Sequence, residues 1–128
     1  MSNVDRFESR IAVDHLRVLL DLGVEFGFDP TSSVEMENYF ANLVQEFRGS
    51  PSDLYAWVRP KIEQSFRCVT SIPRWIQDPD WQLSSNSPMV FVGQIDCPPA
   101  GGLFHDDASF YVFFDPTSGK RSTIVQVA

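Results

Sequence analysis

The sequence predicts an α+β fold: one domain in which N-terminal helices (residues 1–68) pack on a C-terminal, mainly antiparallel β-sheet (residues 69–128). Apolar residues recur at helical spacing in the first half. Beyond Val69 prolines interrupt the chain and the apolar period shortens toward two. The length of 128 residues corresponds to about one domain. The net charge of −7 is spread over both halves, with 11 acidic and 7 basic residues through Cys68 and 6 and 3 beyond it, so no charged tail separates them.

The first two helices are predicted from apolar spacing and start signals. The first is expected from Val4 to about Leu22, where Gly23 and Gly27 break its pattern. Ser32 followed by Glu35 forms a capping box, in which the serine oxygen and the carboxylate satisfy free amide groups. The helix that it opens is expected to continue to about Phe47.

A third helix is expected after Ser50, because a serine cap followed by Pro51 at the first helical position repeats the start signal. Its apolar residues recur from Leu54 to Phe66. Pro60 lies inside this pattern and is expected to kink or shift the helix, since proline lacks an amide donor.

Three strands are predicted in the second half. Met89–Ile95 is continuous enough in apolar residues to be covered on both faces. Phe110–Phe114 is a second apolar run, and Thr123–Val127 is a third strand, which alternates. Between the last two, Asp115-Pro116-Thr117-Ser118-Gly119 is typical of a hairpin with a type I turn and bulge, because proline presets the turn and glycine accepts a positive φ.

Composition excludes several classes of function. An acidic chain with no basic cluster argues against nonspecific binding of nucleic acid or anionic membranes. Neither a signal peptide nor a membrane span is predicted, so we expect a cytoplasmic protein in which Cys68 and Cys97 are reduced thiols. The excess of phenylalanine (11 residues) is expected to fill a core between helices and sheet. The residues concerned are Phe7, Phe40, Phe47, Phe66, Phe91, Phe110, Phe113 and Phe114.

The densest group of metal-ligating or acid–base residues is His105, Asp106 and Asp107, with Asp96 nearby in sequence. A histidine beside carboxylates is suited to bind a divalent metal or to act as a general base. Zinc sites need three or four convergent ligands, and adjacent residues on a strand point apart. We therefore favour a turn capped by the two aspartates, and we expect no metal, cofactor or catalytic set.

Asp78 and Asp80 lie between Trp75 and Trp81, which suggests two functions. Carboxylates beside tryptophans are typical of carbohydrate clefts, where rings stack on sugars. An Asp-Pro turn whose flanking tryptophans anchor a loop to the core is the interpretation that we favour. Because tryptophan is common both in cores and at interfaces, the sequence leaves open whether Trp75 and Trp81 form a binding platform.

Gln94 is a polar residue inside an apolar strand, so its amide requires hydrogen-bonding partners. It either locks the sheet to a neighbouring loop or presents an amide to a ligand, and we favour the first. Gln94 is a candidate binding residue together with the two tryptophans and two aspartates above.

The order Pro73-Arg74-Trp75, then Pro88 to Ile95 ending in Gln94-Ile95, then Gly102-Leu103 and Phe113-Phe114 resembles the core pattern of the YwqG-like family. The resemblance covers roughly residues 72–128. It implies a bacterial α+β protein without an accepted catalytic set. Because relatives occur near toxin systems, it also implies an immunity or adaptor role.

These observations favour a non-enzymatic protein-interaction protein with an acidic surface that suits a basic protein partner. The alternatives are a small metal-binding or hydrolytic domain centred on His105, Asp106 and Asp107, and a small-ligand-binding module that uses Trp75 and Trp81. The sequence does not specify an oligomeric state.

Overall fold

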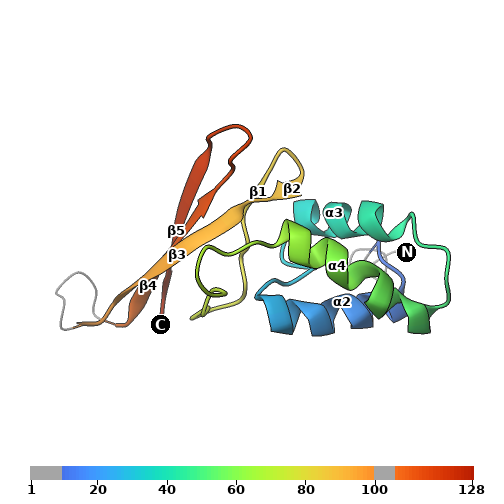
Figure 1. Cartoon of the computed structure of the whole chain (residues 1–128). Helices are drawn as coiled ribbons and strands as arrows, with labels where there is room; N and C mark the ends of the chain where they lie inside the picture. The colour runs from blue at the N-terminus through green and yellow to red at the C-terminus, as the bar shows by residue number, and fades with distance from the viewer. Residues whose placement is uncertain (1–9, 100–105) are drawn as a thin grey trace.

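The computed structural model describes residues 10–99 and 106–128, which form helices followed by strands (Figure 1). The α+β class predicted from the sequence is therefore confirmed. The elements, in chain order, are α2 (Val13–Phe26), α3 (Val34–Val44), a 3-10 helix (Pro51–Asp53), α4 (Leu54–Ser65), β1 (Leu83–Ser84), β2 (Ser87–Pro88), β3 (Val90–Cys97), β4 (Ala108–Phe114) and β5 (Arg121–Val127).

Helix α2 begins at Val13, later than the predicted start at Val4, and residues 4–9 lie outside the described part of the chain. The prediction that Gly23 breaks this helix is wrong, since α2 continues to Phe26. A single glycine costs a helix only about 1 kcal/mol relative to alanine. Gly23 is needed for a different reason: the carbonyl of Phe28 packs so closely that any side chain at Gly23 would collide with it. Gly27, at φ 89°, ends the helix in the left-handed conformation.

The later helices begin close to their predicted starts, with two corrections. Ser33 rather than Ser32 caps α3, because its Oγ accepts a hydrogen bond from the amide of Met36 (3.0 Å). This helix ends at Val44, short of the predicted Phe47. Helix α4 runs through Pro60, which occupies an exposed position.

The main sheet has the strand order β3-β4-β5, and both pairs are antiparallel. A register shift between Phe91 and Gly93 interrupts the β3–β4 pairing. The predicted hairpin between β4 and β5 is confirmed: Gly119 has φ 78°, and its amide donates to the carbonyl oxygen of Asp115 (2.7 Å). A second, smaller hairpin pairs β1 with β2 through Ser85 and Asn86, both at positive φ, and was not predicted.

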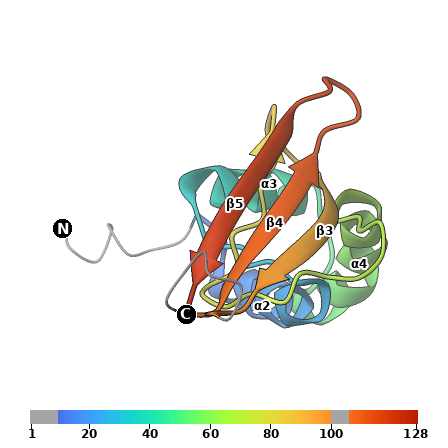
Figure 2. The same ribbon diagram turned by 90° about the vertical axis from the view of Figure 1, so that its left-hand side faces the viewer.

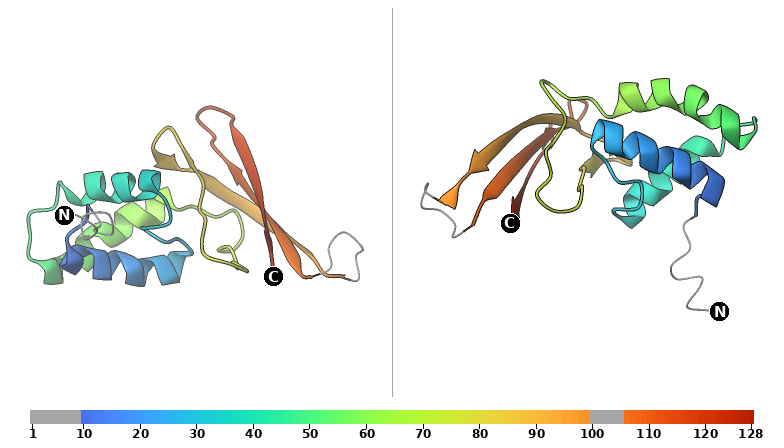
Figure 3. Two further views of the ribbon diagram at one scale, coloured as in Figure 1. Left: turned by 180° about the vertical axis from the view of Figure 1, so that it is seen from behind. Right: turned by 90° about the horizontal axis from the view of Figure 1, so that it is seen from below.

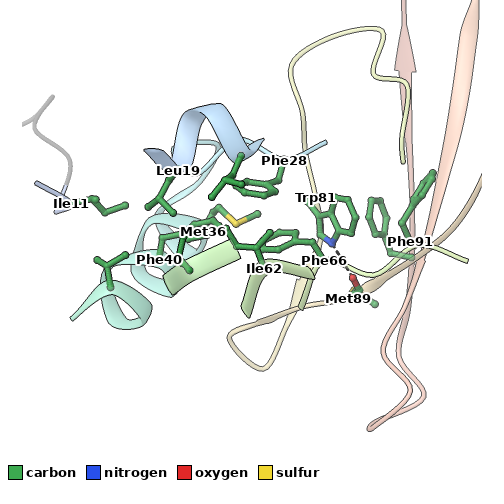
Figure 4. Close-up of a cluster of buried hydrophobic side chains, with 14 of the residues drawn as sticks. Ile11, Leu19, Phe28, Met36, Phe40, Ile62, Phe66, Trp81, Met89 and Phe91 are labelled. Atoms are coloured by element: carbon green, nitrogen blue, oxygen red, sulfur yellow. Dashed lines mark hydrogen bonds between the residues drawn. The ribbon is translucent and has the colours of Figure 1, made fainter. Parts of the chain in front are cut away.

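The helices lie behind one face of the sheet, which we call the inner face (Figure 2). Trp81 occupies the centre of the buried cluster between the two layers, with its ring 5.2 Å from that of Phe66 and 5.6 Å from that of Phe113 (Figure 4). On the helical side of Trp81, the rings of Phe28, Phe40 and Phe66 stack on one another. The predicted phenylalanine core is confirmed for Phe40, Phe66, Phe91 and Phe113, with Trp81 between its two sides, while Phe7 lies outside the described residues.

The opposite face of the sheet, which we call the outer face, carries no helix in Figure 2. The prediction that the Met89–Ile95 strand is covered on both faces is wrong, since Ile95 is 62% exposed and Val92 is 39% exposed. Phe110 and Phe114 are also on this face and not in the core, because they alternate with buried Tyr111 and Phe113 along β4. An apolar run in a strand predicts pairing but not which face is covered.

Candidate binding site

Residues 72–80, which we call the crossing segment, run between the helices and the sheet without regular secondary structure (Figure 3). Each strand of the main sheet contributes one inner-face side chain that binds the backbone of this segment: Gln94 from β3, Tyr111 from β4 and Gln126 from β5. The strands therefore fix the position of the segment that carries Trp75, Asp78 and Asp80.

Gln94 uses both ends of its amide. Its Oε1 accepts from the amide of Arg74 (2.8 Å), while Nε2 donates to the Arg74 carbonyl oxygen (3.1 Å), to Asp96 Oδ1 (2.9 Å) and to Ser109 Oγ (3.2 Å). The hydrogen bonds from Ser109 and Gln94 hold the pKa of the Asp96 carboxyl below its usual range, and Arg74 lowers it further. These contacts match the interpretation in which Gln94 locks the sheet to a loop.

Tyr111 and Gln126 complete this attachment. The Tyr111 hydroxyl donates to the Arg74 carbonyl oxygen (2.9 Å) and accepts from the amide of Ile76 (3.0 Å). Gln126 accepts from the amide of Gln77 and donates to the Asp78 carbonyl oxygen, both at 2.8 Å. Neither residue was predicted as a site residue from the sequence. The available signal at Gln126 was a polar side chain at an inward position of an alternating strand.

Trp75 joins the crossing segment to the end of α2. Its indole Nε1 donates to the Gly27 carbonyl oxygen (2.7 Å), and its ring stacks on that of Tyr111 with centroids 4.5 Å apart. The side chain remains half-buried. Trp75 is therefore held in place while part of its surface stays accessible.

An apolar groove of about 280 Å³ lies between α2 and the crossing segment. Its lining combines Leu20 and Val24 of α2 with Ile72, Pro73 and Trp75 of the crossing segment. Val24 is 84% exposed and Ile72 is 41% exposed, so the rim presents apolar side chains to solvent.

The groove adjoins an acidic hollow of about 400 Å³, and Asp29 and Pro79 line both. Asp78 and Asp80 also line the hollow. Asp29 is fixed locally, since its Oδ1 accepts from the amide and the hydroxyl of Thr31 (both 2.8 Å). The two adjoining hollows thus offer an apolar part and a part lined by three aspartates.

Trp81 does not share this surface. It is 1% exposed, and its Nε1 donates to the Met89 carbonyl oxygen (2.8 Å) inside the core. The hypothesis of a binding platform formed by Trp75 and Trp81 is therefore wrong, because only Trp75 reaches the surface. The sequence could not distinguish these residues, since both follow prolines in similar polar surroundings.

The predicted metal-ligating residues are not brought together in the described part of the chain. Asp106 and Asp107 are exposed, while His105 lies outside the described residues. Asp96 pairs with Arg74 at 2.8 Å. Within residues 10–99 and 106–128, no group of three or more histidine, cysteine, aspartate or glutamate side chains could hold a metal ion.

Cys68 and Cys97 are both free thiols, as predicted. None of the helices described is long and apolar enough to cross a membrane. Comparisons of the chain with protein-family models, with curated proteins and with solved structures find no match.

Proposed function

We propose that the chain is a non-enzymatic protein-interaction protein whose apolar groove and acidic hollow bind a segment of a basic partner protein. The observation that carries this proposal is that the two adjoin: Asp29 lines both the groove with exposed Val24 and Ile72 and the hollow with Asp78 and Asp80. A matching segment places an apolar side chain in the groove and a lysine or arginine in the hollow.

The two parts contribute differently to binding. Burying an apolar side chain of the size of leucine contributes about 1.5–3 kcal/mol, so the groove supplies affinity. The carboxyl groups of the hollow lie at the surface, where salt screens them, so they contribute more to orientation and to association rate. The net charge of −7 adds long-range attraction for a basic protein.

The narrower role follows from the resemblance of residues 72–128 to the YwqG-like family. Under this part of the proposal, the chain is a bacterial immunity or adaptor protein, and its partner is a basic toxin domain. Co-expression with the product of an adjacent reading frame tests this role. A stoichiometric complex that is lost in the Val24→Asp variant supports this role. Cells that still survive expression of the toxin when they carry the Val24→Asp variant contradict it.

Selection of peptides tests the groove directly. A library of random peptides displayed on phage is selected against the immobilised chain, and we expect enrichment of an apolar residue next to lysine or arginine. The affinity of one selected synthetic peptide is then measured by calorimetry. Val24→Asp is expected to weaken it at least about tenfold, which corresponds to 1.4 kcal/mol. Combined replacement of Asp78 and Asp80 by asparagine should reduce its dependence on salt.

The matched control is Val13→Asp, because Val13 is another exposed valine of the same helix and does not line the groove. It should leave peptide affinity unchanged. Enrichment of acidic peptides, or equal losses in Val13→Asp and Val24→Asp, would contradict the proposal.

A further inference from the structure

The two edges of the main sheet differ in how they are covered. At the β3 edge, the amide of Phe91 donates to the Arg67 carbonyl oxygen and the amide of Val69 donates to the Phe91 carbonyl oxygen, both at 2.9 Å. Residue Cys68 thereby forms a parallel bridge with Phe91. At the β5 edge, no described segment pairs as a strand, and the side chain of Gln77 reaches only the Val127 carbonyl oxygen (2.8 Å).

The flanking hydrogen bonds show which backbone groups of β5 point away from β4. The amide of Asp115 donates to the Lys120 carbonyl oxygen, and the amide of Ala128 donates to the Asp107 carbonyl oxygen (both 2.8 Å). In an antiparallel pair, hydrogen-bonded positions alternate, so the even-numbered residues of β5 bond to β4. The odd-numbered ones, Arg121, Thr123, Val125 and Val127, direct their amide and carbonyl groups outward, and of these carbonyl groups that of Val127 accepts from Gln77.

Beyond Arg121 at its first residue, this edge lacks the features that keep exposed strands apart. Natural edge strands usually carry charges, proline or bulges, or are covered. Residues 122–127 read Ser-Thr-Ile-Val-Gln-Val, with no charge and no proline, and their register with β4 is regular. Val125 is 46% exposed and belongs to the apolar outer face, which continues up to this edge.

We propose that β5 pairs antiparallel with β5 of a second copy of this chain, about a two-fold axis at Ile124, so that two sheets of three strands become one of six. In this register the seven residues of β5 lie opposite one another, and the Arg121 amide shares the Val127 carbonyl oxygen of the second copy with Gln77 of that copy. On the outer face, Thr123 lies opposite Val125 of the second copy, so two β-branched side chains meet. On the inner face, Ser122 lies opposite Gln126 of the second copy, so two polar side chains meet. A shift by two residues would place Ser122 opposite Ile124.

Charge favours the same arrangement. Lys120 and Arg121 are exposed at one end of β5, while Asp106 and Asp107 are exposed beside its other end. Antiparallel pairing about Ile124 brings the basic end of each copy next to the acidic end of the other. This proposal does not rest on the groove, so purified chain without a partner tests it.

The association is measured by sedimentation equilibrium of the full chain from about 1 to about 200 µM. We expect the mass to rise from 14.5 kDa toward twice this value. Thr123→Lys places a charge at the paired edge and should raise the midpoint concentration at least about tenfold. Ile95→Lys is the control, since Ile95 is exposed on the same face but on β3. It should leave the midpoint unchanged.

The register is tested by disulfide formation. Residue 124 of one copy faces residue 124 of the other, so Ile124→Cys should form a covalent dimer on mild oxidation, whereas Ser122→Cys and the wild-type chain should not. A wild-type chain that stays at 14.5 kDa over the whole range overturns the proposal. Dissociation by Ile95→Lys with no effect of Thr123→Lys also overturns it, because the contact would then use the outer face.

Discussion

Trp81→Phe is expected to lower the free energy of unfolding by about 2–4 kcal/mol, because this indole connects the two layers of the core. The side chain is 1% exposed, and its Nε1 donates to the Met89 carbonyl oxygen at 2.8 Å. Removing the donor leaves that carbonyl buried without its partner, at a cost of about 1–3 kcal/mol. The smaller phenyl ring also leaves a void beside Phe66 and Phe113, which adds about 1 kcal/mol.

Trp75→Phe is the matched control. It removes a hydrogen bond of similar length (2.7 Å, to the Gly27 carbonyl oxygen), but its side chain is half-buried and water can replace the lost donor. We expect a loss below about 1 kcal/mol. Urea unfolding followed by circular dichroism measures both. With a slope of about 1.5 kcal/mol per molar urea, Trp81→Phe should lower the midpoint by more than about 1 M.

Equal losses from the two substitutions would refute this reasoning, as would a loss below about 0.5 kcal/mol for Trp81→Phe. The same experiment tests the prediction of one domain. Buried residues of the helices and of the sheet belong to one cluster, so the helical signal and tryptophan fluorescence should change at the same urea concentration.

Three further results are expected. Gly119→Ala should cost about 1 kcal/mol in thermal unfolding, because Gly119 has φ 78°, and Gly119→Asn should cost less since asparagine tolerates this conformation. Hydrogen bonds from Ser118 and Ser84 lower the pKa of the Asp115 carboxyl, so its contribution to stability is present above about pH 4 and is lost as the pH falls through the lowered pKa. Urea midpoints between about pH 5 and 2 should therefore fall less steeply in Asp115→Asn than in the wild-type chain. Burial raises the pKa of the Cys68 thiol, so its alkylation by iodoacetamide, followed by mass spectrometry, should be slower than that of glutathione at the same pH.

The order and type of the main elements could be predicted from the sequence because local signals determine them. Helical spacing and serine caps indicated the three helices, and Gly119 indicated the hairpin. Ser32 was predicted as the cap because Glu35 follows it at capping-box spacing, whereas Ser33 caps the helix through the Met36 amide alone, which requires no glutamate. The β1–β2 hairpin was missed because strands of two residues show no alternation.

The candidate site could be predicted only in part. Trp75, Asp78 and Asp80 were identified because they form a dense group of unusual residues in the sequence. The opposite wall of the groove, Leu20 and Val24, lies about fifty residues away in the chain, and only folding brings it near. Both fit the apolar helical spacing that predicted the first helix, yet both are exposed, because helix amphipathicity does not specify how far a neighbouring layer extends.

The attachment of the crossing segment by side chains has a consequence for hydrogen exchange. The amides of Arg74, Ile76 and Gln77 donate to Gln94, Tyr111 and Gln126 although the segment has no regular secondary structure. Their protons are therefore expected to exchange slowly, at rates set by the opening of the sheet that supplies the acceptors. A loop that belongs to the same cooperative opening unit as the strands beneath it keeps one geometry on the time scale of binding, so the groove that it lines is formed before any partner arrives.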